Sequence, residues 1–175
     1  FFLRRIRVGF TGLKRYDGGV EQILEQVIED AWNKEKEYFM VSSGHFKVFY
    51  TRDFGWCCRA LIELGYKQRV RKTLAYASEM FKKHGDVTTS INSRGKAFNF
   101  PTIASDSVPF LIRSLRILND EKLIKDHKEF LNRCIERYSV YVFDDDEGMV
   151  KKDIWLSSMK DHAVRNSSCY DNCMC

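Results

Sequence analysis

The spacing of apolar residues predicts helices of two kinds that alternate along the chain. Segment 20–31 places apolar side chains at helical intervals on one face, as a helix with one buried side requires. Segment 55–65 has few polar positions on any face, which favours a fully buried helix. The one-sided pattern returns at 67–83 and 121–138, and the more apolar pattern at 108–118.

This alternation predicts an all-α fold class, with apolar helices inside and half-exposed helices outside. A sixth helix is expected to begin near Asp161 and to run to Cys175. Residues 1–175 are expected to form one domain, in which 1–17 lead into about six helices between 18 and 175. Only two prolines and ten glycines argue against an all-β design with many turns. The helices should stack as antiparallel hairpins.

Long connections are expected at one end of these hairpins. Segments 85–105 and 140–160 are unusually long for links between helices, whereas the other connections are tight turns. Asp53, Asp106 and Asp161 each precede an inner helix and are separated by 53 and then 55 positions. A period near 50 indicates a repeated helical unit. The three aspartates are therefore expected on one rim, where functional residues gather.

The segment that begins at Tyr50 has the residue types of a sugar site. Arg52 offers a fork of donors and Asp53 an acceptor carboxylate, so together they can bind adjacent hydroxyl groups. Tyr50 and Trp56 offer flat apolar faces on which a pyranose ring can pack. The alternative is structural, with Asp53 as a helix N-cap and Arg52 as its salt-bridge partner.

Tyr-Thr-Arg-Asp-x-Gly, followed by an apolar helix, resembles a segment of the six-hairpin (α/α)6-barrel glycosidase superfamily, which includes glucoamylase, glycogen-debranching and trehalase-like enzymes. That fold has twelve helices, so the resemblance implies about half of a barrel, its N-terminal half. It also implies that Tyr50, Arg52 and Asp53 hold the sugar where the bond is cleaved. Asp106 begins an Asp-x-x-Pro segment similar to the entry of the fourth barrel helix, close to substrate; a helix cap is the alternative.

The same resemblance implies a catalytic role for Asp161. Aligning 159–161 with the Trp-Met-Asp or Gly-Trp-Asp of debranching and trehalase-like enzymes makes Asp161 the general acid, which needs a raised pKa. Lys160 beside it would instead favour the ionised form. A rival alignment matches 153–155 with the Asp-Leu-Trp-Glu of glucoamylases. That alignment places Leu156 at the acid position and leaves no acid.

The resemblance implies an inverting glycoside hydrolase whose substrate is an oligosaccharide or other α-glucoside. Such enzymes need two carboxyl groups, and the family's base lies in the part of the barrel that would follow Cys175. We therefore expect this chain to be inactive alone, with the C-terminal half of the barrel as its missing partner. Without that half, the chain should expose an apolar flank.

Two other functions stay open at this point. Stacked helical hairpins also form non-catalytic modules that bind a protein or peptide. A sugar lyase or epimerase on a similar helical toroid would use bases such as His45, Tyr50 or His162. Convergence of the aspartates on one rim would favour the glycosidase.

Charge and hydropathy predict neither nucleic-acid nor membrane partners. The net charge of +5 comes from 29 basic and 24 acidic residues, and the densest basic run, 67–72, is typical of a solvated helix face. No apolar run reaches the ~18–20 residues of a membrane span.

No cofactor and no metal site are predicted. The acidic run 144–147 lacks the ligand pattern of a calcium loop. Cys169, Cys173 and Cys175 lack the spacing of a structural zinc site. Six cysteines without such a pattern indicate a reducing compartment, and we expect the cytoplasm.

Overall fold

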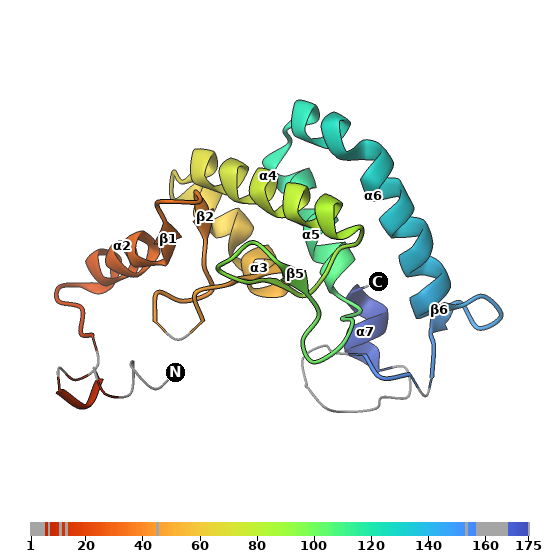
Figure 1. Cartoon of the computed structure of the whole chain (residues 1–175), viewed down its shortest axis with the longest axis horizontal. Coiled ribbons are helices and arrows are strands. Elements are labelled where there is room, and N and C mark those ends of the chain that lie inside the picture. The colour runs from red at the N-terminus through yellow and green to blue at the C-terminus, as the bar shows by residue number, and fades with distance from the viewer. Residues whose placement is uncertain are drawn as a thin grey trace.

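The computed structural model describes residues 6, 8–10, 12, 14–44, 46–152, 154–156 and 168–174. Within them, single helices or pairs of consecutive helices are separated by very short strands (Figure 1). The main helices are α2 (Val20–Ala31), α3 (Thr51–Glu63), α4 (Lys67–His84), α5 (Ser107–Leu118), α6 (Glu121–Val142) and α7 (Cys169–Met174). The strands are β1 (Trp32–Asn33), β2 (Tyr38–Phe39), β3 (Phe49–Tyr50), β4 (Ser90–Ile91), β5 (Ala97–Phe98), β6 (Phe143–Asp144) and β7 (Met149–Val150).

The prediction of an all-α fold is wrong, because the described chain also forms three small antiparallel sheets. β1 pairs with β2, β6 pairs with β7, and β3, β4 and β5 make a sheet of three strands. The prediction of half a barrel built from stacked helical hairpins is therefore wrong as well. The chain is a mixture of helices and strands.

Turn chemistry explains the hairpins that helical periodicity missed. Asn33, Asn92 and Asp144 each open a hairpin turn, and the side-chain oxygen of each accepts two backbone N–H bonds of 2.9–3.2 Å. Such side chains compete with helical hydrogen bonding and favour turns. The acidic run 144–147 is one of these turns, and 145–147 are exposed, as expected of a solvated loop.

The helix positions were predicted more closely than the fold class. α2, α4 and α5 match their predicted ranges to within one residue at each end. α3 begins at Thr51, four residues early, and α6 continues to Val142. α7 begins at Cys169, and the predicted start at Asp161 lies outside the described residues.

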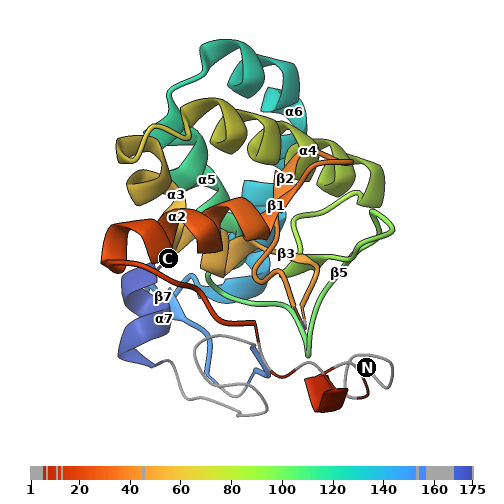
Figure 2. The ribbon, with the colours of Figure 1, turned by 90° about the vertical axis from the view of Figure 1, so that its left-hand side faces the viewer.

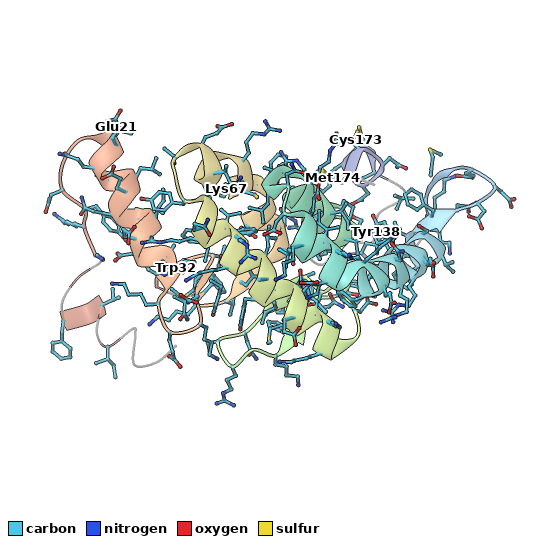
Figure 3. The ribbon with its side chains drawn as sticks, turned by 90° about the horizontal axis from the view of Figure 1, so that it is seen from above. Glu21, Trp32, Lys67, Tyr138, Cys173 and Met174 are labelled. Carbon is cyan, nitrogen blue, oxygen red and sulfur yellow. The ribbon has the colours of Figure 1, made fainter. Side chains whose placement is uncertain are left out.

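α3 and α5 lie side by side and form the centre of the structure (Figure 2). Their close approach depends on Gly55, because a Cβ atom there would lie 2.4 Å from Cδ1 of Phe110. α4 covers this pair with Leu74 and Phe81, whose side chains have no exposed surface. Seen from above, α4 lies between α2 and α6 (Figure 3).

One face of α3 remains open, so the prediction of a fully buried helix is wrong. Trp56 is 55% exposed and Leu64 is 52% exposed. Across from them, Leu24 and Val27 of α2 also reach solvent. A mostly apolar cavity of about 400 Å³ lies between the two helices. These residues form an exposed apolar flank, although not as the open side of half a barrel.

Candidate functional site

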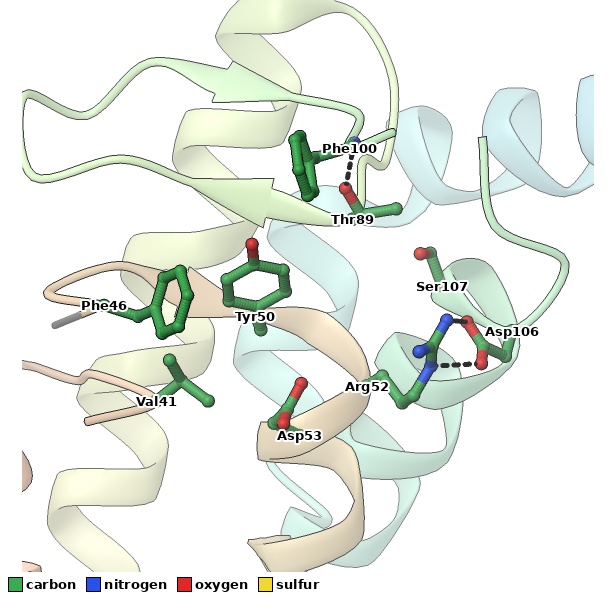
Figure 4. A pocket seen from close by; sticks show the side chains of 9 residues that line it. All are labelled: Val41, Phe46, Tyr50, Arg52, Asp53, Thr89, Phe100, Asp106 and Ser107. Atoms are coloured by element: carbon green, nitrogen blue, oxygen red, sulfur yellow. Dashed lines mark hydrogen bonds and ion pairs between the residues drawn. The ribbon is translucent and has the colours of Figure 1, made fainter. Parts of the chain in front are cut away.

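A cavity of about 280 Å³ lies where α3 and α5 begin (Figure 4). Its lining combines aromatic rings, charged groups and hydroxyls. The lining residues are Val41, Phe46, Tyr50, Arg52, Asp53, Thr89, Phe100, Asp106 and Ser107. This mixture of apolar surface and converging polar groups is typical of a small-molecule site.

The three-stranded sheet positions one wall of the cavity. β3 leads directly into α3 and pairs Tyr50 with Ser90 of β4. The Thr51 amide donates to the Thr89 carbonyl at 3.0 Å, and the Thr89 hydroxyl accepts from the Phe100 amide at 2.8 Å. These bonds place Phe100 on the side of the cavity opposite α3 (Figure 4).

Arg52 is held by Asp106 on the far side of the cavity. Nε of Arg52 donates to Oδ2 of Asp106 at 2.5 Å, and Nη2 donates to Oδ1 at 3.4 Å. The Tyr170 hydroxyl donates to the same Oδ2 at 2.8 Å. Asp106 has no exposed surface, so its carboxylate is committed to these two neighbours. Burial, reinforced by the bond to Asp106, raises the pKa of Tyr170.

A second buried carboxylate extends this network. Asp171 is 1% exposed and accepts from the Ser105 hydroxyl at 2.7 Å and from the Ser168 hydroxyl. The first turn of α7 therefore meets the segment just before α5 through Tyr170 and Asp171. Three helices, α3, α5 and α7, thus begin at one end of the structure and are tied together there.

The carboxyl group of Asp53 has a different environment. It lies in the first turn of α3, between Tyr50 and Arg52, and makes no salt bridge within the described residues (Figure 4). Its side chain reaches solvent, yet surrounding atoms displace part of its water, and this desolvation raises the pKa of Asp53. A carboxyl group that is open to the cavity and partly desolvated can accept bonds from a ligand.

The geometry tests the interpretation of Asp53 and of Asp106 as helix caps. The N-cap of α3 is Tyr50, so the prediction of Asp53 as a cap is wrong, and the salt-bridge partner of Arg52 is Asp106. Asp106 does occupy the N-cap position of α5, but its side chain makes no capping bond.

The structure brings together four of the predicted site residues, namely Tyr50, Arg52, Asp53 and Asp106. Trp56 faces the neighbouring apolar cavity instead. The predicted acid, Asp161, lies outside the described residues.

Some of the other predicted candidates also lie outside the described residues. His45, Lys160 and His162 are not described. In the rival alignment, Leu156 belongs to a small apolar cluster with Val142 and Val150, and it is 3% exposed.

Sequence reasoning missed Phe46 and Thr89, which reach the cavity from distant segments, and Tyr170, which holds Asp106 from α7. A lone threonine or phenylalanine in a loop carries no local signal of a site. Tyr170 lies in a segment where the sequence was examined only for the spacing of its cysteines.

Within the described residues, no group of three or more His, Cys, Asp or Glu side chains could hold a metal ion. None of the described helices combines the length and the apolar character needed to cross a bilayer. Compared with known proteins, the chain matches no family model and has no significant match among curated proteins or solved structures.

Proposed function

We propose that the cavity at the start of α3 and α5 binds a sugar unit, and that the chain belongs to a protein that hydrolyses α-glucosidic bonds. The main observation behind the proposal is Asp53. Its carboxyl group has no salt bridge to any described residue and lies in a cavity lined by Tyr50, Phe46 and Phe100. Carboxylates accept bonds from sugar hydroxyls, and flat rings pack against the apolar faces of a pyranose.

Arg52 supports this proposal in a more limited way than the motif suggested. Two of its nitrogens are directed at Asp106, so the guanidinium group is fixed in orientation. It keeps 25% of its side-chain surface exposed, which leaves donor capacity toward the cavity. Asp106 then acts through Arg52 and does not itself contact the sugar.

Hydrolysis requires two catalytic carboxyl groups, and Asp53, which we assign to sugar binding, is neither of them. Glycosidases use an acid and either a base or a nucleophile on opposite sides of the bond. Asp53 is the only described aspartate or glutamate that lines the cavity and has no salt bridge. The acid that we propose is Asp161, as the family resemblance implies.

Binding and hydrolysis are tested separately. Titration calorimetry with maltooligosaccharides and trehalose should show binding that Asp53→Asn weakens about tenfold or more, since a lost bond to a charged group costs about 1.5–3 kcal/mol. Asp126→Asn, an exposed aspartate on α6, is the matched control and should bind like the wild type. Equal affinities of the wild type and Asp53→Asn would exclude this cavity as the sugar site. Any hydrolysis that Asp161→Asn leaves undiminished would remove Asp161 as the acid.

The apolar flank supports a second candidate, a surface that binds a protein. Leu24, Val27 and Trp56 are all exposed around the cavity between α2 and α3. Clusters of this kind mark interaction sites. Replacing Trp56 with Gln should abolish such an interaction and leave sugar binding intact, which separates the two candidates.

A reducing compartment such as the cytoplasm is part of the proposal. Cys57, Cys58, Cys134, Cys169 and Cys173 are free thiols. Free thiols persist where glutathione and thioredoxin keep them reduced.

A further inference from the structure

The second half of the α3–α5 pair carries a cluster of arginines that the sugar site does not use. Arg59, Arg113 and Arg116, together with Ile117, line a cavity of about 530 Å³. The two cavities share no lining residue. Arg59 follows Asp53 by six residues on α3, which is about 9 Å along the helix axis at 1.5 Å per residue. The arginine cluster is therefore a separate site.

The packing of α3 on α5 brings the three side chains together. Nη1 of Arg113 donates to the Gly55 carbonyl at 2.8 Å, and the Cys58 thiol lies 3.8 Å from the Ser114 carbonyl. Arg59 comes one helical turn after Gly55, so it lies beside the segment of α5 that holds the other two. Arg113 and Arg116 are three residues apart and share a helix face.

This cluster lacks the acidic partners that four arginines elsewhere in the described chain have. Arg52, Arg69, Arg71 and Arg137 each form a salt bridge with an aspartate or glutamate. In the part of the chain that the structure describes, none of Arg59, Arg113 and Arg116 does. Arg113 is half-buried and fixed by its bond to Gly55, so one guanidinium group is already oriented. Three like charges around one cavity repel each other, and an anion would relieve this repulsion.

We propose that the arginine cavity binds a phosphate group, either the free ion or a small organic phosphate. The planar fork of a guanidinium group matches two oxygens of a phosphate, which carries about −1.5 to −2 charges near neutral pH. A carboxylate offers two oxygens and one charge, so it would leave most of the cluster unneutralised. Ile117 and the arginine stems provide apolar contacts for the organic part of an ester.

Titration calorimetry at constant ionic strength tests this site with three probes: orthophosphate, pyrophosphate and a hexose monophosphate. The wild type should bind at least one of them saturably. Arg59→Gln and Arg116→Gln should each raise Kd at least tenfold, whereas Arg133→Gln, an exposed arginine on α6, should leave it unchanged. Binding of orthophosphate identifies the free ion as a ligand, and binding of the ester alone identifies an organic phosphate.

Three results would overturn the proposal. The first is no saturable binding of any probe, and the second is equal weakening by Arg133→Gln, which would mean non-specific attraction. The third is self-association of the wild type that Arg116→Gln abolishes without any phosphate binding, because the cluster would then contact acidic groups of a second copy. Circular dichroism checks folding, and Asp53→Asn should bind phosphate normally, which keeps this test independent of the sugar proposal.

Discussion

The arginines at the two ends of the α3–α5 pair lie in opposite environments. At the start of the helices, Arg52 meets the fully buried Asp106, and Tyr170 completes the contact. Further along the same helices, Arg59 and Arg113 face a cavity in which the described residues supply no acid. The scaffold is the same at both ends, so the difference lies in the partners.

This contrast separates structural charges from available ones. A guanidinium group paired with a buried carboxylate holds elements together, and breaking such a pair leaves an uncompensated charge. An unpaired group is free to bind a ligand. The same distinction applies to the acids, because Asp106 is committed to the fold while Asp53 faces the cavity.

Removing the buried carboxylate should give the largest effect. Asp106→Ala removes the hydrogen-bond partner of Arg52 and Tyr170, and we expect a loss of about 3 kcal/mol in the free energy of unfolding. This is the lower part of the usual range for buried pairs, because Arg52 keeps 25% of its side-chain surface in water. Urea denaturation measures it, with Asp126→Ala as the control. A loss below about 1 kcal/mol would contradict a structural role for Asp106.

The close approach of the helices should give the next effect. Gly55→Ala places a Cβ atom 2.4 Å from the ring of Phe110 and 2.8 Å from its Cβ, so the helices must separate. Overpacking of this kind should cost about 2 kcal/mol. The cost should shrink in a Phe110→Ala background, where the ring is gone. An unchanged cost in that background would mean that Gly55 is needed for another reason.

The tie to α7 should be weaker. Tyr170→Phe keeps the ring and removes the hydroxyl that donates to Asp106 at 2.8 Å. Hydrogen bonds to charged groups contribute about 1.5–3 kcal/mol, and we expect about 1.5 kcal/mol in urea denaturation. In an Asp106→Ala background the substitution should have almost no effect. An effect of full size there would show that the Tyr170 hydroxyl acts through a different partner.

Long helices could be predicted from the sequence, whereas the sheets could not. α4 and α6 repeat their apolar stripe over several turns, so the period is well determined. β1 and β6 have two residues each, which is too short for an alternating pattern to be recognised. Asn33 and Asp144 carried the available signal, as turn-forming side chains two residues after the end of a helix.

The residues of the candidate site could likewise be predicted only in part. Tyr50 to Asp53 are contiguous, so a local motif was enough to select them. The contacts of Asp106 with Arg52 and Tyr170 join residues 54 and 64 positions apart. No periodicity within one helix reports a contact over that distance, which is why Asp106 was interpreted as a ligand or a cap.

The smallest effect on stability should come from Asp53, the carboxyl group that faces the cavity. Partial desolvation raises the pKa of Asp53 above its ordinary 3.8, so the folded chain holds this proton more tightly than the unfolded chain does. The contribution to stability is therefore full below pH 3.8 and is lost as the pH rises through the folded-state pKa. Asp53→Asn cannot ionise, so relative to it the wild type should lose stability as the pH rises through this window. Because the side chain reaches water, the change should be the smallest of the four, and urea denaturation at a series of pH values measures it. A difference that stays flat with pH, or that has the opposite sign, would mean that Asp53 is fully solvated or paired, and the contrast with Asp106 would be lost.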